Sequence, residues 1–237
     1  SSFDQNIDYL PINLKYLSLG MLFNKPVNSL PDNLIYLKFG YYFDQSVDNL
    51  PVSLKYLIFG DHFNQSIDNL PNNIIYLKLG KRFNHLVDNL PSSLNTLILS
   101  DLYLKPLGDL PNKIEFIKIS IYQNYKNLPK KIKNLVLGDD FKSNKYLINN
   151  YHILFYSNEL LDLKNHTFNI LFDDLPKSIK ILTLPIVLDT PIYHIPDFLE
   201  ILRIYDSVSF EILKFLDNIE NSKLQIQVII SDDFIFW

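Results

Sequence analysis

A Leu-Pro pair recurs every 20 residues through the first half of the chain, and this period constrains the fold more than any other feature. The pairs in strict phase are Leu10-Pro11, Leu30-Pro31, Leu50-Pro51, Leu70-Pro71, Leu90-Pro91 and Leu110-Pro111. An aromatic residue keeps the same phase at Phe3, Phe23, Phe43, Phe63, Phe83 and Tyr103. Repeats of this length indicate a solenoid, because a single coil buries its apolar face only against its neighbours.

Each coil has room for one short strand and little helix, because 20 residues cannot hold a strand, a long helix and two turns. The alternating residues 16–19 predict that strand, with Leu17 and Leu19 pointing inward and Tyr16 and Ser18 outward. The glycines that follow the strands, at positions 20, 40, 60, 80 and 138, are expected at turns that need glycine's conformational freedom. The predicted fold is a solenoid of about ten coils with one short parallel strand per coil.

The repeat is regular over residues 3–120 and degenerate over residues 121–205. Later coils follow Leu128-Pro129, Leu175-Pro176 and Ile195-Pro196, and one degenerate coil is placed at residues 154–163, where the register is least defined. Residues 206–237 are expected to cap the solenoid with an amphipathic helix at 209–218 and a strand at 224–230. Nothing comparable precedes Phe3, so we expect a missing N-terminal segment or a second chain that covers the first coil.

The amino-acid composition excludes several classes of functional site. The chain has no cysteine, which excludes disulfides, thiolate nucleophiles and Cys-based zinc sites. Its net charge of −4 and pI near 5.7 give no overall electrostatic attraction to nucleic acid or an anionic membrane surface. A reducing, cytoplasmic location is expected (the host-cell cytoplasm if the protein is viral), and no membrane contact, because a signal peptide and long apolar runs are absent. The histidines are scattered without metal-ligand spacing. We therefore expect no enzyme activity, no metal and no cofactor.

One coil begins with Phe23-Asn24-Lys25-Pro26 and continues with Val27, Leu30-Pro31, Leu34, Leu37 and Gly40. This pattern resembles the FNIP repeat, a short leucine-rich-repeat variant known mainly from social amoebae and giant viruses of amoebae. The resemblance covers residues 3–120 and continues more weakly to 205. It implies a leucine-rich-repeat-like solenoid that acts as a non-catalytic protein-interaction scaffold.

Several members of that family carry an F-box ahead of the repeats, which implies substrate recruitment to a ubiquitin ligase. No F-box is recognisable in these residues. A role as the substrate-recognition part of a ubiquitin-ligase adaptor is therefore implied by the resemblance together with the expected N-terminal segment.

The outward positions of the strands form columns across the coils, and these columns are the candidate binding surface. The predicted partner-binding residues are Tyr16, Tyr36, Tyr56, Tyr76 and Phe116 in one column, and Lys38, Ile58, Lys78, Ile98 and Lys118 in the next. Just ahead of the strands lie Lys15, Ile35, Lys55, Ile75, Asn95 and Glu115. This face is aromatic and basic, whereas acidic residues fall in the turns, at Asp4, Asp8, Asp44, Asp48, Asp68 and Asp88.

Such a face is expected to bind an acidic or aromatic-rich protein segment, because tyrosine offers a rigid amphipathic contact area. In an alternative interpretation the tyrosines stack between coils and only stabilise the sheet. Interleaved lysines and aromatics also suit single-stranded nucleic acid, which the acidic pI disfavours. A third alternative is a self-associating structural protein, with a homodimer formed through the N-terminal coil.

Overall fold

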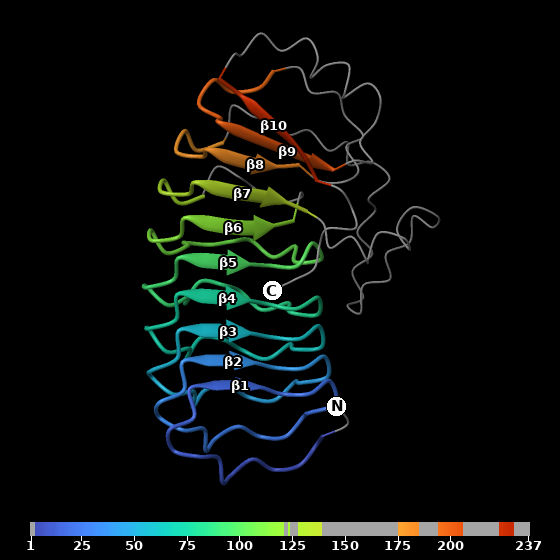
Figure 1. Cartoon of the computed structure of the whole chain (residues 1–237), viewed down its shortest axis with the longest axis vertical. Helices are drawn as coiled ribbons and strands as arrows, with labels where there is room; N and C mark the ends of the chain where they lie inside the picture. The colour runs from blue at the N-terminus through green and yellow to red at the C-terminus, as the bar shows by residue number, and fades with distance from the viewer. Residues whose placement is uncertain are drawn as a thin grey trace, which may run out of the picture.

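The computed structural model describes residues 3–120, 123, 128–138, 175–184, 194–205 and 223–229. These residues form a solenoid whose coils stack along the long axis of the molecule, with the N-terminal coil at one end (Figure 1). All strands of the described chain belong to one parallel sheet in which the spatial order follows the sequence, β1 to β10. No helix occurs among the residues that the structure describes.

The strands are short and evenly spaced along the first half of the chain. They are β1 (Tyr16–Ser18), β2 (Tyr36–Lys38), β3 (Tyr56–Ile58), β4 (Tyr76–Lys78), β5 (Thr96–Ile98), β6 (Phe116–Ile119), β7 (Asn134–Leu137), β8 (Ile181–Thr183), β9 (Ile201–Tyr205) and β10 (Gln225–Ile229). Pairing follows the repeat, so that Tyr16 lies opposite Tyr36 and Leu17 opposite Leu37. The predicted solenoid with one short parallel strand per coil is confirmed. Each coil is named below after its strand.

The proline ahead of each strand shapes the turn that leads into it. The backbone N–H of Leu14 donates to the carbonyl O of Pro11 at 2.9 Å, and that of Leu34 donates to Pro31 at 3.1 Å. The proline supplies an acceptor and lacks only a donor, which a turn ahead of the strand does not need. The same bond recurs coil after coil, which explains why the Leu-Pro phase and the strand phase coincide.

The core is built from inward columns of identical or similar side chains. Leu37, Leu57 and Leu77 are fully buried on the inner side of the sheet. Behind them the phenylalanine rings stack from coil to coil, with ring centroids 6.1 Å apart for Phe23 and Phe43 and 6.2 Å apart for Phe43 and Phe63. Because each ring contacts the ring before and after it, the apolar core is continuous along the coils.

The phenylalanine column changes character after Tyr103. The Tyr103 ring is buried, which raises the pKa of its phenol, and the following coil has Gln123 in place of an aromatic residue. The Gln123 side chain is also buried, and its Nε2 donates to the carbonyl O of Tyr103 at 2.9 Å and to that of Lys105 at 3.0 Å. These bonds satisfy the amide, so a polar residue closes the aromatic column without an unpaired donor.

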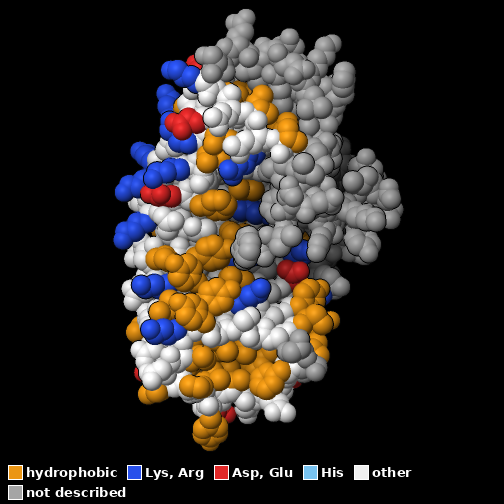
Figure 2. Space-filling model, in the orientation of Figure 1, with side chains coloured by type: hydrophobic (Ala, Val, Ile, Leu, Met, Phe, Trp, Pro, Cys, Tyr) orange, Lys and Arg blue, Asp and Glu red, His pale blue; other side chains and the backbone are white. Residues whose placement is uncertain are grey.

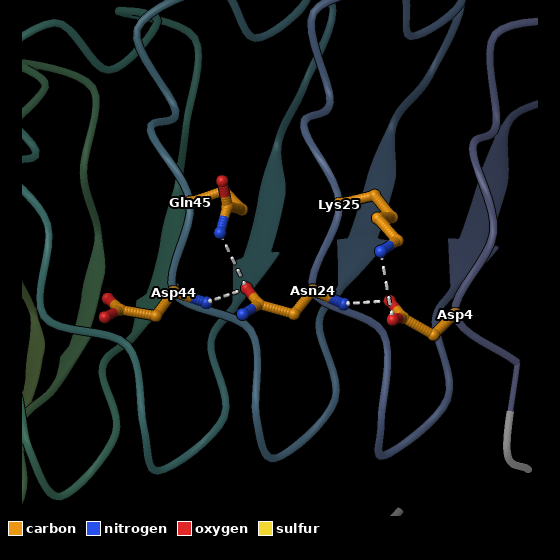
Figure 3. A network of polar contacts seen from close by, with 5 residues as sticks. All are labelled: Asp4, Asn24, Lys25, Asp44 and Gln45. Carbon is orange, nitrogen blue, oxygen red and sulfur yellow. Dashed lines mark hydrogen bonds and ion pairs between the residues drawn. The ribbon is translucent and has the colours of Figure 1, made fainter.

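A ladder of Asp and Asn side chains, called the Asx ladder, joins the turns of neighbouring coils (Figure 3). The Oδ1 atom of Asp4 accepts from the backbone N–H of Asn24 at 2.9 Å, and Asn24 Oδ1 accepts from the N–H of Asp44 at 2.9 Å. The next two steps of the ladder join Asp44 to Asn64 at 2.8 Å and Asn64 to Asn84 at 2.9 Å. The position therefore takes a short side chain with an acceptor oxygen, since either Asp or Asn satisfies the turn of the next coil.

A second polar column runs through the turns at Asp48 and Asp68. The Ser46 hydroxyl donates to Asp48 Oδ2 at 2.7 Å, and Asn69 Nδ2 donates to Asp48 Oδ1 at 3.0 Å. Asp68 repeats the arrangement with its own serine and with an asparagine one coil further on. These hydrogen bonds stabilise the ionised forms and hold the pKa values of both carboxyls below their usual range.

Most of the glycines that follow the strands are needed for a different reason from the one predicted. Among the described glycines only Gly108 and Gly138 have positive φ, 56° and 62°. At Gly40, Gly60 and Gly80 the backbone instead runs so close to the previous coil that a Cβ would overlap the carbonyl group of the preceding glycine. The expectation of conformational freedom was correct for Gly138 and wrong for these three, where the tight stacking of the coils excludes a side chain.

In the second half of the chain the sheet is continuous from β7 to β10. Strand β7 pairs directly with β8, so no strand from the degenerate coil placed at residues 154–163 lies between them in the sheet. That coil falls within residues 139–174, which lack the Leu-Pro phase. Those residues, and the helix predicted at 209–218, lie outside the described part of the chain. The strand predicted at 224–230 is β10, which pairs in parallel with β9.

Candidate functional site

The surface formed by the outward side chains of the strands, together with the residue just ahead of each strand, is called the strand face. Figure 2 shows hydrophobic side chains gathered across this face, with lysine and arginine side chains along the edge at which the strands begin. The face is regular because the sheet pairs residues 20 apart from β1 to β6. The predicted site residues therefore form two parallel columns.

The aromatic column holds Tyr16, Tyr36, Tyr56 and Tyr76, continued by Thr96 and Phe116. Tyr16 is 68% exposed and Tyr56 is 39% exposed, whereas Tyr36 and Tyr76 are partly buried. Ring contacts join Tyr16 to Tyr36 and Tyr56 to Tyr76, both with centroids 6.4 Å apart. The column therefore combines coil-to-coil contact with aromatic surface that remains open to solvent.

The second column alternates lysine with isoleucine. Lys38 is exposed, whereas Ile58, Lys78, Ile98 and Lys118 are partly buried. The ammonium of Lys118 lies 3.6 Å from a carboxylate oxygen of Asp101, a residue of the preceding coil. This contact shows that a side chain in the second column reaches the residues that follow the strand of the neighbouring coil.

Anionic partners are distributed unevenly among the lysines of the strand face. In the later coils Lys133 pairs with Glu115 at 3.0 Å and Lys180 pairs with Glu200 at 2.9 Å. In the first three coils the exposed lysines are Lys15, Lys38 and Lys55. Within the described part of the chain none of these three has an ion pair or a hydrogen-bonded carboxylate.

A cluster that the sequence analysis missed lies where the strands of the first three coils end. It consists of Met21, Leu22, Tyr41, Tyr42 and His62, and is called the rim cluster. Met21 is 54% exposed, and Leu22, Tyr41 and Tyr42 are also exposed. The imidazole of His62 packs against both tyrosine rings, with centroids 4.6 Å from Tyr41 and 4.7 Å from Tyr42. Apolar residues directly after the glycines at 20 and 40 were the signal for this cluster.

His62 links the rim cluster to the coil of β4. Its Nδ1 lies 3.1 Å from a guanidinium nitrogen of Arg82, which can only donate, so Nδ1 accepts and the ring is neutral. Burial is the main reason that the pKa of His62 lies below its usual value, and the positive charge of Arg82 lowers it further. Asp61 and Asp44 act in the opposite direction and do not reverse the shift.

The described residues of the strand face form an extended surface of outward side chains. No group of three or more His, Asp or Glu side chains in the described ranges is arranged to hold a metal ion. In the same residues no helix is long and apolar enough to cross a membrane. The arrangement is suited to contact with another macromolecule over an extended face.

Comparisons with known proteins agree with the repeat and the fold. The family model of the FNIP repeat matches residues 3–42, 23–62, 47–69 and 63–102. The crystal structure of CroV588, described as a novel circular LRR protein structure, is similar to this chain with a TM-score of 0.50 and 24% sequence identity. The similarity covers 95% of this chain and 42% of CroV588, so the chain spans less than half of that protein. No curated protein sequence matches the chain.

Proposed function

Residues 3–102 of this chain match the FNIP repeat and lie in a parallel-strand solenoid, and from this premise we propose that the strand face is a protein-recognition surface. The observation that carries the proposal is the open aromatic column, in which Tyr16 and Tyr56 keep much of their surface in solvent although the sheet has ample apolar core on its other side. Exposed apolar surface that is contiguous, and not scattered, is typical of an interaction site.

The regular spacing of the coils supports recognition of a protein rather than a small molecule. An outward column presents one side chain per coil at intervals of about 4.8 Å, so a partner contacts several coils at once. The surface is continuous across the strands of separate coils. The buried side chains of the inner columns, and not the outward ones, stabilise the solenoid. The outward residues are therefore free to vary with the partner.

The finer proposal is that the chain is the substrate-recognition part of a ubiquitin-ligase adaptor acting in the cytoplasm. Its support is the FNIP resemblance, since several proteins of that family carry an F-box. In such an adaptor the strand face would hold the substrate and another segment would contact the ligase. The measurement that separates this role from a simple scaffold is the recovery of ligase subunits and ubiquitinated substrate with the full-length protein.

The test of recognition is affinity capture from host-cell lysate with two matched chains. One is the wild type and the other carries Tyr36→Ser, Tyr56→Ser and Tyr76→Ser. A protein retained by the wild type alone, with both chains unfolding at the same urea concentration, supports recognition by the aromatic column. A variant that fails to fold favours the alternative in which the tyrosines only stabilise the sheet.

The two alternative functions, nucleic-acid binding and self-association, predict different measurements. Nucleic-acid binding predicts that labelled single-stranded oligonucleotides bind at low salt and dissociate steeply as salt rises. Self-association through the N-terminal coil predicts a sedimentation coefficient that rises with protein concentration. It also predicts loss of that rise when Ile12, an exposed residue of the first coil, is replaced by Glu.

A further inference from the structure

The later coils show how the strand face neutralises its own lysines. Lys118 has a carboxylate, Asp101, in the preceding coil at the position that follows the strand. Lys133 and Lys180 have carboxylates beside them in the column just ahead of the strands, at Glu115 and Glu200. Each of these lysines therefore has an anion supplied by a neighbouring coil of the same chain.

The first three coils keep the lysines and replace the anions with apolar residues. The position that Asp101 has relative to Lys118 is taken by Met21 relative to Lys38, since both pairs are one coil step apart. In the column ahead of the strands, the neighbours of Lys15 and Lys55 are Ile35 and Ile75. In these coils the lysines thus occupy the ion-pair positions of the later coils, but an apolar residue stands where the carboxylate would be.

The rim cluster borders the same three coils. The exposed side chains of Met21, Tyr41 and Tyr42 lie where the strands end, opposite the edge that carries Lys15 and Lys55. The exposed rings of Tyr16 and Tyr56 lie between the two edges. Cations and uncovered apolar groups therefore alternate across a surface three coils wide.

We propose that the strand face of coils β1 to β3 binds an extended acidic segment whose carboxylates pair with Lys15, Lys38 and Lys55 and whose apolar side chains cover the tyrosines and the rim cluster. This inference rests on the proposed protein-recognition function and names the chemistry of the partner. The partner supplies the anions that Glu115, Asp101 and Glu200 supply within the chain further along.

Strand geometry sets the spacing of the acidic residues. Lys15 and Lys55 are two coils apart, which corresponds to about 10 Å along the solenoid axis. A peptide in the polyproline II conformation advances about 3.1 Å per residue with three residues per turn, so side chains three residues apart lie on the same side of the peptide and about 9 Å apart. A segment in this extended conformation that lies along the axis therefore places acidic residues at i and i+3 beside Lys15 and Lys55, with apolar residues between them available to the tyrosine column.

The decisive variant gives these coils the anions that the later coils already have. Met21→Asp places a carboxylate opposite Lys38, as Asp101 is opposite Lys118, and Ile35→Glu places one between Lys15 and Lys55. The lysines stay in place but are neutralised within the chain. The matched control is Ile12→Asp with Val52→Glu, which changes two exposed apolar residues to acids in the turns ahead of the strands.

The experiment is a selection of displayed random peptides of about 12 residues, long enough when extended to cross three coils. Peptides enriched on the wild type are then titrated as fluorescent probes against both variants. The expected result is enrichment in Asp and Glu beside Phe, Tyr or Leu. The expected loss of affinity is about tenfold or more for Met21→Asp/Ile35→Glu and no more than about twofold for the control.

Two outcomes would overturn the inference and are told apart by the tyrosine variant. Enriched peptides without acidic residues, or with unchanged affinity for Met21→Asp/Ile35→Glu, refute the acidic partner. If those peptides still lose affinity for Tyr36→Ser/Tyr56→Ser/Tyr76→Ser, the proposed recognition function stands. If no selected peptide distinguishes the wild type from the tyrosine variant, both the inference and the proposed function fail.

Discussion

The inner and outer sides of the coils follow different rules. On the inner side the same residue type recurs at the same depth, as in the buried column of Leu37, Leu57 and Leu77. On the outer side the aromatic column repeats tyrosine, but the second column changes from coil to coil, from Lys38 to Ile58 to Lys78. The inner side must match the coil before and after it, so it determines the fold. The outer side is not held to that match, and it is the side that we propose binds a partner.

The largest expected effect comes from removing a ring of the inner side. Phe43 is fully buried, stacks on Phe39 with centroids 3.7 Å apart, and contacts a ring in each neighbouring coil. Phe43→Ala should lower the free energy of unfolding by about 3–5 kcal/mol, through lost burial and the cavity it leaves. Urea unfolding measures the change. The adjacent residue Tyr42 is exposed, and Tyr42→Ala should cost much less; equal losses would contradict the division between the two sides.

A smaller effect is expected where the backbones of two coils touch. A Cβ at Gly60 would overlap the carbonyl O of Gly40, so Gly60→Ala should destabilise the chain by about 1–3 kcal/mol, as overpacking does. The measurement is the midpoint of thermal unfolding. Ser100 occupies the equivalent position in the coil of β5, where a Cβ is already accommodated, so Ser100→Ala is the control. A Gly60→Ala chain as stable as the wild type would show that the coils separate enough to admit a side chain.

The Asx ladder should contribute less than either. Asp44 Oδ1 accepts from the N–H of Asn64 at 2.8 Å and from Gln65 Nε2 at 3.0 Å, both near the surface. Asp44→Ala should therefore lower the free energy of unfolding by about 0.5–1.5 kcal/mol. Asp44→Asn keeps the acceptor and should behave like the wild type, because Asn24 and Asn64 occupy the same position. Loss of stability in the Asn variant as well would mean that charge, and not the hydrogen bond, matters there.

The smallest effect concerns the pH dependence of the rim cluster. The pKa of His62 is lowered from 6.5 by burial and by Arg82, with Asp61 and Asp44 opposing the shift. Below pH 6.5 the unfolded chain therefore takes up a proton before the folded chain does, and the free energy of unfolding falls until the folded pKa is passed. Urea midpoints between pH 7.5 and 5.5 should decrease more in the wild type than in His62→Gln. An equal decrease in both chains would remove His62 from the explanation.

Much of this fold could be predicted from sequence because the 20-residue period also gives the register in which the strands pair. Once residues 17, 37 and 57 are recognised as one column, the direction of every outward residue in the first coils follows, including Tyr36 and Lys38. The coil boundaries follow from the Leu-Pro pairs, since the proline carbonyl closes the same turn each time. Later strands were found wherever the pair survived, as ahead of β7, β8 and β9.

The remainder depends on contacts between coils, which a period does not describe. Predicting the role of Gly60 would need the distance between two backbones, which the sequence does not give. Predicting the ion pair of Lys133 and Glu115 would need the positions of both side chains. The direct pairing of β7 with β8 could be seen only in the sheet, because the intervening residues 139–174 contain no Leu-Pro pair that would indicate the register. The rim cluster was missed since Met21 and Tyr41 follow a glycine at a turn, where apolar residues have no core to face.

The Asx ladder has a consequence for how such a molecule changes its length. Every step joins an Asp or Asn to the N–H one coil further on, so the junction between any two of these coils is chemically the same. Removing residues 44–63 would bring Asn64 next to Asn24, and the acceptor that Asp44 used would serve Asn64 instead. The solenoid can thus be shortened or extended in whole coils of 20 residues, while each coil carries its own outward residues with it. Gain or loss of one coil would then add or remove one row of the strand face and leave the others in register.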